Sequence, residues 1–246
     1  MESPFVLLEI KNSRDSEEPV SSMEQVFAAM GSGKPSGLLA RLFGSKHSPK
    51  WLSFEMVSVN AGVHFFLSTP EELRGYIESQ LTAQYPKVLL SPVADYTPHF
   101  LSLPHAAGQL SLASPYYLPL KTHKDVRDLD LLASVLGTMA KLPTGEAMAI
   151  QMWVSPAGTN WQKTAAGVVA RGIPDPTSTT GRTKSHPQAR LIEAKISQVG
   201  FVAAIRLVAV AANEKRAGEL LSTVAGAYGV FGLGEGNRLA LSQPAF

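Results

Sequence analysis

Hydrophobic positions in the first hundred residues switch between a period of two and a period near 3.6, which predicts alternating strands and helices. In segment 5–11, Val6, Leu8 and Ile10 share one face, as in a half-buried strand. The expected elements are a strand at 5–11, a helix from Ser21 or Ser22 to about Met30, strands at 50–59 and 63–69, a helix from about 69 to 85, and a strand at 87–94. This β-α-β-β-α-β order is that of ferredoxin-like folds.

The remaining sequence predicts the same order again. Its expected elements are a strand at 109–120, a helix at 126–141, strands at 145–156 and 199–212, a helix from Asn213 to about Tyr228, and a strand at 237–242. The inward residues expected for the 126–141 helix are Leu129, Leu132, Val135 and Met139. Residues 65–67, Ile77 and Leu81 agree with residues 208–210, Leu220 and Val224. We therefore expect an α+β protein of two tandem ferredoxin-like units, 1–100 and 101–246, with an insertion at 157–198 in the second unit. Another α+β layout remains the alternative.

Both faces of the first predicted sheet carry apolar residues. If Val6, Leu8 and Ile10 face the helices, strand alternation places four other residues on the opposite face: Phe5, Leu7, Trp51 and Phe66. A face this apolar is expected to be covered by the sister unit or by another subunit, and we treat these four residues as a candidate interaction surface. Stacking of nucleic-acid bases on them is the alternative, although the basic, glycine-rich pattern of RNA-recognition motifs is missing.

Composition excludes several classes of protein. The 246 residues contain no cysteine, so disulfides and thiolate metal sites are excluded. The formal charge is only +2, so any basic surface must be local. The N-terminus has no secretory signal pattern, and the longest apolar stretch, 199–212, is interrupted by Arg206 and too short to span a bilayer. We expect a cytoplasmic protein.

The predicted insertion is strongly basic. It carries six basic residues and two acidic ones, Asp175 and Glu193. The basic residues are Lys163, Arg171, Arg182, Lys184, Arg190 and Lys195. Residues 174–181 have no hydrophobic period, which predicts a mobile loop. We take the six cations as candidate contacts to a nucleic-acid backbone or an acidic partner, with a solvated loop of no function as the alternative.

No catalytic motif is intact. Gly31-Ser32-Gly33-Lys34-Pro35 is similar to the end of a phosphate-binding loop, but Ala28 stands where the first glycine belongs and Pro35 where the metal-binding hydroxyl belongs. Gly232-Leu233-Gly234-Glu235-Gly236 is predicted to follow a helix and precede a strand, the reverse of a dinucleotide fingerprint. We predict that neither segment binds a nucleotide.

Other reactive side chains have simpler explanations. The six histidines lack the spacing of metal ligands, and no GxSxG nucleophile elbow occurs. Asp125, Asp128 and Asp130 stand near a predicted helix start, where carboxylates cap backbone amides. We expect no metal, no cofactor and no enzymatic activity.

Several short segments, in this order and spacing, carry a resemblance to a known family. They are 7–11, 23–27, 53–55, 63–70, 77–81, 84–86, 95–97, Gly145-Glu146, Ile150-Gln151, Pro156 and Trp161. In these segments the chain resembles the non-motor N-terminal region of conjugative-transfer, type IV secretion-like ATPases of candidate-phyla (ultra-small) bacteria.

The resemblance implies an accessory region of a hexameric DNA-translocating motor. In such proteins a membrane helix commonly precedes this region and a phosphate-binding-loop motor domain follows it. No segment here matches either, so ATPase activity does not carry over. The expected function is a non-catalytic assembly and docking module at the inner face of the membrane, with other subunits of the translocation assembly and further copies of itself as partners. Two rivals remain: a single-stranded nucleic-acid-binding module, and a structural subunit of another assembly such as a phage particle.

Overall fold

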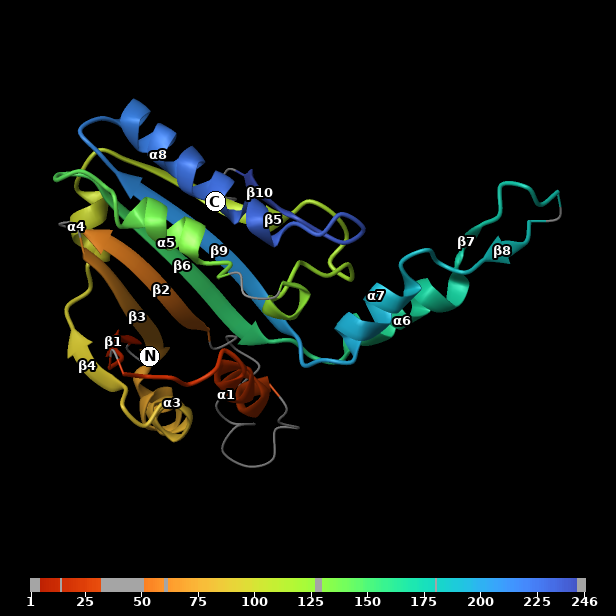
Figure 1. Cartoon of the computed structure of the whole chain (residues 1–246), viewed down its shortest axis with the longest axis horizontal. Helices are drawn as coiled ribbons and strands as arrows, with labels where there is room; N and C mark the ends of the chain where they lie inside the picture. Colours follow the sequence, from red (N-terminus) through yellow and green to blue (C-terminus); the bar gives the residue numbers. More distant parts are fainter. Residues whose placement is uncertain are drawn as a thin grey trace.

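A computed structural model describes residues 5–13, 15–31, 51–59, 62–126, 130–179 and 181–242. Within these ranges the chain forms seven α-helices, one eight-stranded antiparallel sheet and a small two-stranded sheet (Figure 1). The predicted mixed α+β class is confirmed. None of the helices in the described ranges has the length and apolar character needed to cross a membrane.

The first half of the chain follows the predicted element order. Its elements are β1 (Phe5–Lys11), α1 (Ser21–Gly31), β2 (Leu52–Val59), β3 (Gly62–Pro70), α3 (Glu71–Gln84) and β4 (Leu89–Val93). Leu73, Ile77 and Leu81 form the buried stripe of α3, as their helical spacing predicts. The suspected phosphate-binding loop at 31–35 lies, after Gly31, outside the described residues.

The second half begins after a linker that contains the short helix α4 (Thr97–Leu101). Its elements are β5 (His105–Leu112), the 3-10 turn η1 (His123–Asp125), α5 (Ala133–Met139), β6 (Ala147–Pro156), α6 (Asn160–Arg171), β7 (Ile173–Pro174), β8 (Thr183–Lys184), α7 (Ala189–Ile196), β9 (Phe201–Val210), α8 (Glu214–Ala227), the 3-10 turn η2 (Tyr228–Phe231) and β10 (Leu239–Ser242). The Asn213 side chain caps α8 by accepting a hydrogen bond from the Arg216 amide, as predicted.

The eight strands lie in the order β10-β5-β9-β6-β2-β3-β1-β4, and every neighbouring pair is antiparallel. In each half the spatial order is fourth, first, third, second. The two halves join where β2 pairs with β6, with Glu55 opposite Gln151 near the middle of the pair. We call this β2–β6 pair the seam.

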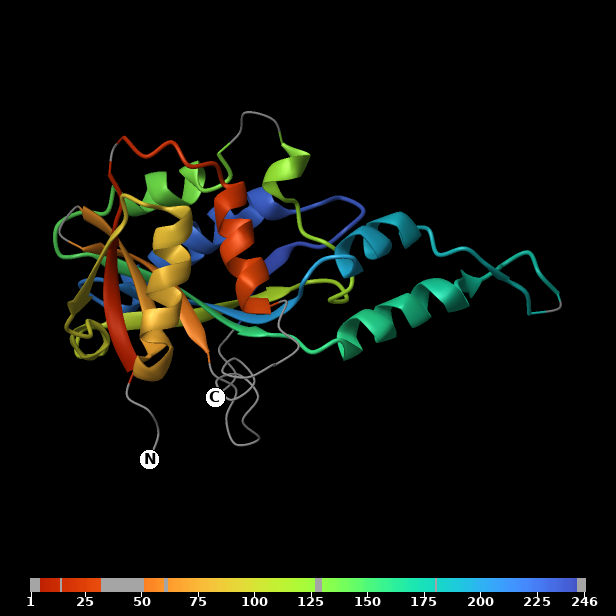
Figure 2. The ribbon, with the colours of Figure 1, turned by 90° about the horizontal axis from the view of Figure 1, so that it is seen from below.

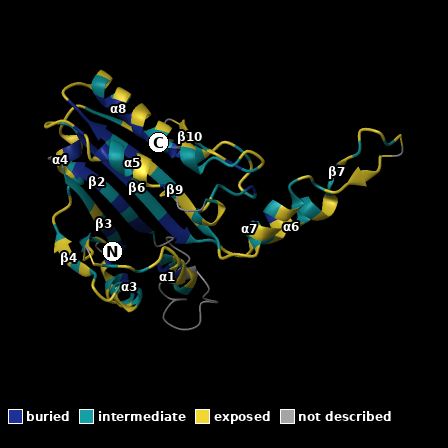
Figure 3. Ribbon diagram, viewed as in Figure 1, coloured by how far each residue is buried: buried dark blue, intermediate teal, exposed yellow. Residues whose placement is uncertain are grey.

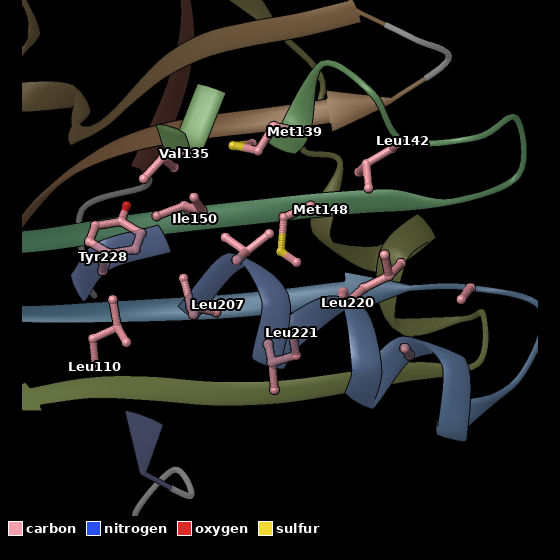
Figure 4. Close-up of a cluster of buried hydrophobic side chains, with 14 residues drawn as sticks. Leu110, Val135, Met139, Leu142, Met148, Ile150, Leu207, Leu220, Leu221 and Tyr228 are labelled. Carbon is pink, nitrogen blue, oxygen red and sulfur yellow. The ribbon is translucent and has the colours of Figure 1, made fainter. Parts of the chain in front are cut away.

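Four helices cover one face of the sheet. Even-numbered residues of both seam strands point toward them, because paired residues lie on the same side of a sheet. In the second half, α5 and α8 enclose a core around Met148, Ile150 and Leu207 (Figure 4). In the first half, α1 and α3 cover Leu8, Leu67 and other apolar residues. Each half therefore has its own hydrophobic cluster on this face, and both seam strands contribute residues to each of the two clusters.

Helix α1 connects the halves directly. Phe27 packs edge to face on Phe54 of β2 and on Phe201 of β9, with ring centroids 5.4 and 5.5 Å apart. Such edge-to-face contacts add to the free energy that burial of the rings provides. The boundary predicted between residues 100 and 101 stays a prediction, and both halves share one sheet.

Three predicted elements differ from the structure. The strand expected at 109–120 lies at 105–112, and the helix expected at 126–141 is only α5, with Leu132 exposed before its start. Leu129 and Asp128 lie outside the described residues. The predicted match of Leu67 with Val210 is also wrong, because Leu67 faces the helices whereas Val210 lies in the cluster on the other face.

The face opposite α1, α3, α5 and α8, which we call the helix-free face because none of these four helices lies on it, is covered in part by the linker and its short helix α4. Tyr96 and Phe100 of the linker pack on Phe66 and Val57. The sister unit does not cover this face, contrary to one of the two expected coverings, because the halves lie edge to edge in one sheet.

Candidate functional site

The basic insertion contains two helices and a hairpin that the sequence did not predict, while its polar centre forms the turn of the hairpin. Residues 157–198 form α6, the β7–β8 hairpin and α7, and we call this segment the arm. Figures 1 and 2 show the arm extending away from the sheet in two perpendicular views. The two helices pack on each other around Ala165 and Ile192, which are fully buried. Most residues of the arm are exposed to solvent (Figure 3).

Two side chains fix the arm at its base. Gln162 of α6 donates hydrogen bonds to the carbonyls of Ile196 and Gln198, at 2.8 and 3.1 Å, and so satisfies the free end of α7. Trp161 lies against Gly200, where a Cβ atom would come within 2.4 Å of the indole ring. The Ala157 amide donates to the Gly200 carbonyl and continues the β6–β9 ladder into the arm. These contacts give the arm a defined direction.

Of the six predicted cations, Lys195 has a structural role. Its ammonium group donates to the carbonyls of Tyr116 and Leu118, and its burial lowers its pKa. Lys195 therefore ties α7 to the loop that follows β5. The other five, Lys163, Arg171, Arg182, Lys184 and Arg190, are exposed, and none forms an ion pair within the described part of the chain.

The arm tip is held by its own backbone and short polar side chains. The Asp175 carboxylate accepts hydrogen bonds from the amide and the hydroxyl of Thr177, which lower its pKa. Gly172 ends α6 at a φ of 63°, and a side chain there would meet the Lys184 carbonyl at 2.2 Å. The hairpin thus presents Arg182 and Lys184 at the far end of the molecule.

The predicted sheet-face residues are only partly brought together. Phe5 and Leu7 line a cavity of about 350 Å³ on the helix-free face, and Phe5 remains 52% exposed. Phe66 lies in the same face but under Tyr96, with ring centroids 5.7 Å apart. Trp51 directly precedes β2 and is half-buried, and no strand pairing includes it. Phe5 and Leu7 therefore form the accessible part of this surface.

Polar residues at the seam complete the cavity, although no motif in the sequence singled them out. Glu55 of β2 is only 4% exposed and accepts hydrogen bonds from the Tyr96 hydroxyl and from Gln151 Nε2, the latter at 3.3 Å. Burial and the neighbouring Glu55 carboxylate strongly raise the pKa of Tyr96, so this phenol stays protonated as a donor. The sequence does contain one signal for this site, because Glu55 and Gln151 are polar residues within two otherwise strongly apolar strands.

No cluster of three histidine or carboxylate side chains in the described ranges has the geometry to hold a metal ion. Asp125 accepts hydrogen bonds from the amide and hydroxyl of Thr122 in a capping box on η1, so it caps a 3-10 turn and not the predicted helix. Asp130 accepts one hydrogen bond from the Leu132 amide, but α5 has no side-chain cap, so the capping role expected of Asp130 is not found. The glycine-rich segment 232–236 lies between η2 and β10, in the predicted turn.

A family match covers nearly the whole chain, through both halves and the arm. The family described as Domain of unknown function (DUF8128) matches residues 2–237. The chain belongs to this family. No curated protein sequence matches this member of the family. Among solved structures, the crystal structure of aclacinomycin oxidoreductase is similar at a TM-score of 0.39 with 10% identity. The alignment covers 92% of this chain and 41% of the oxidoreductase chain, and a similarity at this level carries no functional argument.

Proposed function

We propose that this chain is a non-catalytic assembly and docking module of a conjugation-like DNA-translocation machine, built from two ferredoxin-like units joined edge to edge. The shared strand order of the two halves supports the ferredoxin-like description, since fourth-first-third-second is the order of that fold. The sequence resemblance to the non-motor region of type IV secretion-like ATPases supports the cellular role. Other subunits of the transfer machine and further copies of the chain are the partners that this role requires.

The arm is the observation that favours docking over a purely internal structural role. Five exposed cations, none with an acidic partner among the described residues, stand on an arm that projects from an otherwise slightly acidic body. Unpaired lysine and arginine side chains bind phosphate oxygens and release condensed counterions. We infer that the arm contacts a nucleic-acid backbone or an acidic protein surface while the sheet remains rigid. A single-stranded nucleic-acid-binding module is the second candidate, and the same five cations favour it.

A salt-dependent binding measurement tests the nucleic-acid contact. Fluorescence anisotropy of labelled single-stranded and duplex DNA is followed at several salt concentrations for the wild type and for the triple variant Arg182→Ala, Lys184→Ala, Arg190→Ala. Each lost phosphate contact is expected to reduce the log–log salt slope by up to about 0.7 for single strands or about 0.9 for duplex. A control variant, Lys141→Ala, Lys215→Ala, Arg238→Ala, removes the same charge from exposed sites of the body.

The two variants separate a specific contact from net charge. If the arm binds the backbone, the arm variant loses affinity and slope much more than the body variant. Equal losses would show that only net charge matters, and unchanged binding in both would reject the nucleic-acid contact. The alternative contact is an acidic protein subunit of the transfer machine, and a binding assay with that subunit tests it. If the wild type and the body variant bind the subunit and the arm variant does not, the arm docks on a protein surface.

A further inference from the structure

The cavity on the helix-free face contains a buried carboxylate without a counter-charge. Glu55 lies at the seam, 4% exposed, and no lysine, arginine or histidine of the described ranges is within ion-pair distance of it. Its two hydrogen-bond donors, the Tyr96 hydroxyl and Gln151 Nε2, are both neutral and both reach the same oxygen, Oε2. Removing a carboxylate from water without a cationic partner is unfavourable, so a protein retains such a group when it has a use.

A second carboxylate on the same face shows the contrast. Glu9 lies two strands away in the same row of the sheet, since Glu9 pairs with Phe66 and Phe66 pairs with Glu55. Glu9 contacts Lys11 at 2.9 Å and His64 at 3.0 Å, and these hydrogen bonds lower its pKa. Glu9 therefore has basic side chains, Lys11 and His64, within hydrogen-bonding distance, whereas Glu55 has none among the described residues.

The remaining walls of the cavity suit a cation. Phe5 and Trp153 form an aromatic corner, with ring centroids 6.4 Å apart. The Trp153 ring already has a guanidinium next to it, because the Arg206 Cζ atom lies 5.3 Å from its centroid. Asp95 adds a second carboxylate to the lining, so the charged groups that line the cavity are both acidic. Phosphate would be repelled here, which disfavours a nucleic-acid backbone as the ligand.

Two buried polar atoms lack a partner near the same part of the seam. Ser53 Oγ and Trp153 Nε1 have no hydrogen-bond partner among the residues that the structure describes. Ser53 and Trp153 are direct partners across the seam, in the row next to Glu55 and Gln151. Buried polar atoms without partners are rare in folded proteins, and a missing ligand is one physical explanation for a pair of them.

We propose that this cavity binds a guanidinium or alkylammonium group, with Glu55 as the anionic contact and Phe5 and Trp153 as the aromatic walls. Its volume of about 350 Å³ falls within the range of small-ligand sites. The cavity is on the sheet and not on the arm, so this inference goes beyond the proposed docking function. A free amine or guanidine can supply the group, and so can an arginine or lysine from the arm of a second copy.

The first experiment uses two small probes that differ in charge. The full chain, labelled with ¹⁵N, is titrated with n-butylguanidinium and with its neutral analogue n-butylurea, and the indole N–H signals of Trp51, Trp153 and Trp161 are followed by NMR. Butylguanidinium is expected to shift the Trp153 signal saturably with a Kd of about 0.1–10 mM, as suits a ligand of this size. Trp161 in the arm serves as the internal control, and butylurea should bind at least about tenfold more weakly.

Matched carboxylate variants locate the contact. Glu55→Gln is expected to weaken butylguanidinium binding by about 10- to 100-fold, because a hydrogen bond to a charged group is lost. Glu9→Gln removes a carboxylate from the same face and is expected to leave the affinity within about twofold. Glu55→Gln should melt no lower than the wild type, since it neutralises a buried unpaired charge. Absence of a saturable Trp153 shift in the unmodified chain, equal binding of butylurea, or unchanged affinity in Glu55→Gln would overturn the proposal.

A second measurement distinguishes the sources of the cation. If the arm of another copy fills the cavity, sedimentation velocity will show self-association that butylguanidinium inhibits and that both Glu55→Gln and Arg182→Ala, Lys184→Ala weaken. A monomeric chain that still binds butylguanidinium assigns the site to a free amine or guanidine. The arm variants keep the cavity intact, so they should bind butylguanidinium as the wild type does even if they no longer bind nucleic acid. Failure of the cavity proposal and failure of the docking proposal can therefore be recognised separately.

Discussion

Replacing Gly200 by alanine is expected to destabilise the base of the arm. The added Cβ atom would lie 2.4 to 2.6 Å from three atoms of the Trp161 indole. Carbon atoms at optimal contact are about 3.5–4.0 Å apart, so the ring or the backbone must move by about 1 Å. Overpacking of this kind typically costs about 1–3 kcal/mol, and we expect about 2 kcal/mol in the free energy of unfolding. For a chain of this length that corresponds to a Tm lower by about 4–8 °C.

A double-mutant cycle with Trp161→Ala isolates the contact. Trp161 is half-buried, so Trp161→Ala should cost about 1–2 kcal/mol, less than for a fully buried tryptophan. In that background Gly200→Ala should cost less than about 0.5 kcal/mol, because the clashing ring is gone. Urea denaturation of the four proteins gives the coupling energy. As a control, Gly218→Ala in α8 meets no atom within 4 Å and should stabilise the chain by about 0.5–1 kcal/mol.

The cycle also defines what would refute the reasoning. A Gly200→Ala protein as stable as the wild type would mean that the arm base relaxes without cost. An equal loss in the presence and absence of Trp161 would mean that the clash is with some other group. Either result would remove the physical basis for treating the arm as rigidly attached to the sheet.

Three further predictions concern the arm, the core and pH. Gln162→Ala removes two hydrogen bonds, worth about 1–2 kcal/mol, and should speed amide hydrogen exchange in α7 by roughly 5- to 30-fold while leaving exchange in β9 unchanged. Gln198→Ala should have little effect, because only the backbone carbonyl of Gln198 accepts from Gln162. Equal exchange rates in the two variants would contradict the role of the Gln162 side chain. Leu207→Ala, at a fully buried site, should lower the free energy of unfolding by about 2–5 kcal/mol, against less than about 1 kcal/mol for the 52% exposed Leu101→Ala; similar losses in urea denaturation would show that the core is misplaced. The pKa of Asp125 is lowered by its hydrogen bonds from Thr122, so its stabilising effect is complete above the unfolded pKa of about 3.9 and is lost as pH falls through the lower folded value. The stability difference between wild type and Asp125→Asn should therefore be constant at neutral pH and shrink in acid, and a pH-independent difference in thermal melts would reject this.

Periodicity predicted the first half well because its elements are long and amphipathic. Helix α3 was predicted correctly, and its predicted stripe is fully buried. The errors occur where the apolar signal is short. Helix α5 has only seven residues and two buried side chains, so the pattern around it did not fix its ends. The central residues of the arm are polar, and their composition concealed the two helices that flank them.

The cavity was not predictable from the same patterns. Its aromatic wall includes Phe5, which strand alternation did place on the helix-free face. Glu55 and Gln151 come together only because the second strand of one half pairs with the second strand of the other. Nothing local in the sequence specifies that pairing. A polar residue inside an apolar strand marks a position of interest, but its partner is determined by tertiary structure.

The seam has a consequence for the expression of either half alone. Its two strands hold equivalent places in their halves and run antiparallel, which is how two copies of one half would meet in a symmetric homodimer. A single half, expressed alone, would leave the backbone amides and carbonyls of β2 exposed along one edge, ready to pair with another chain. The continuous sheet therefore resembles the sheet of a symmetric dimer whose two halves are connected covalently.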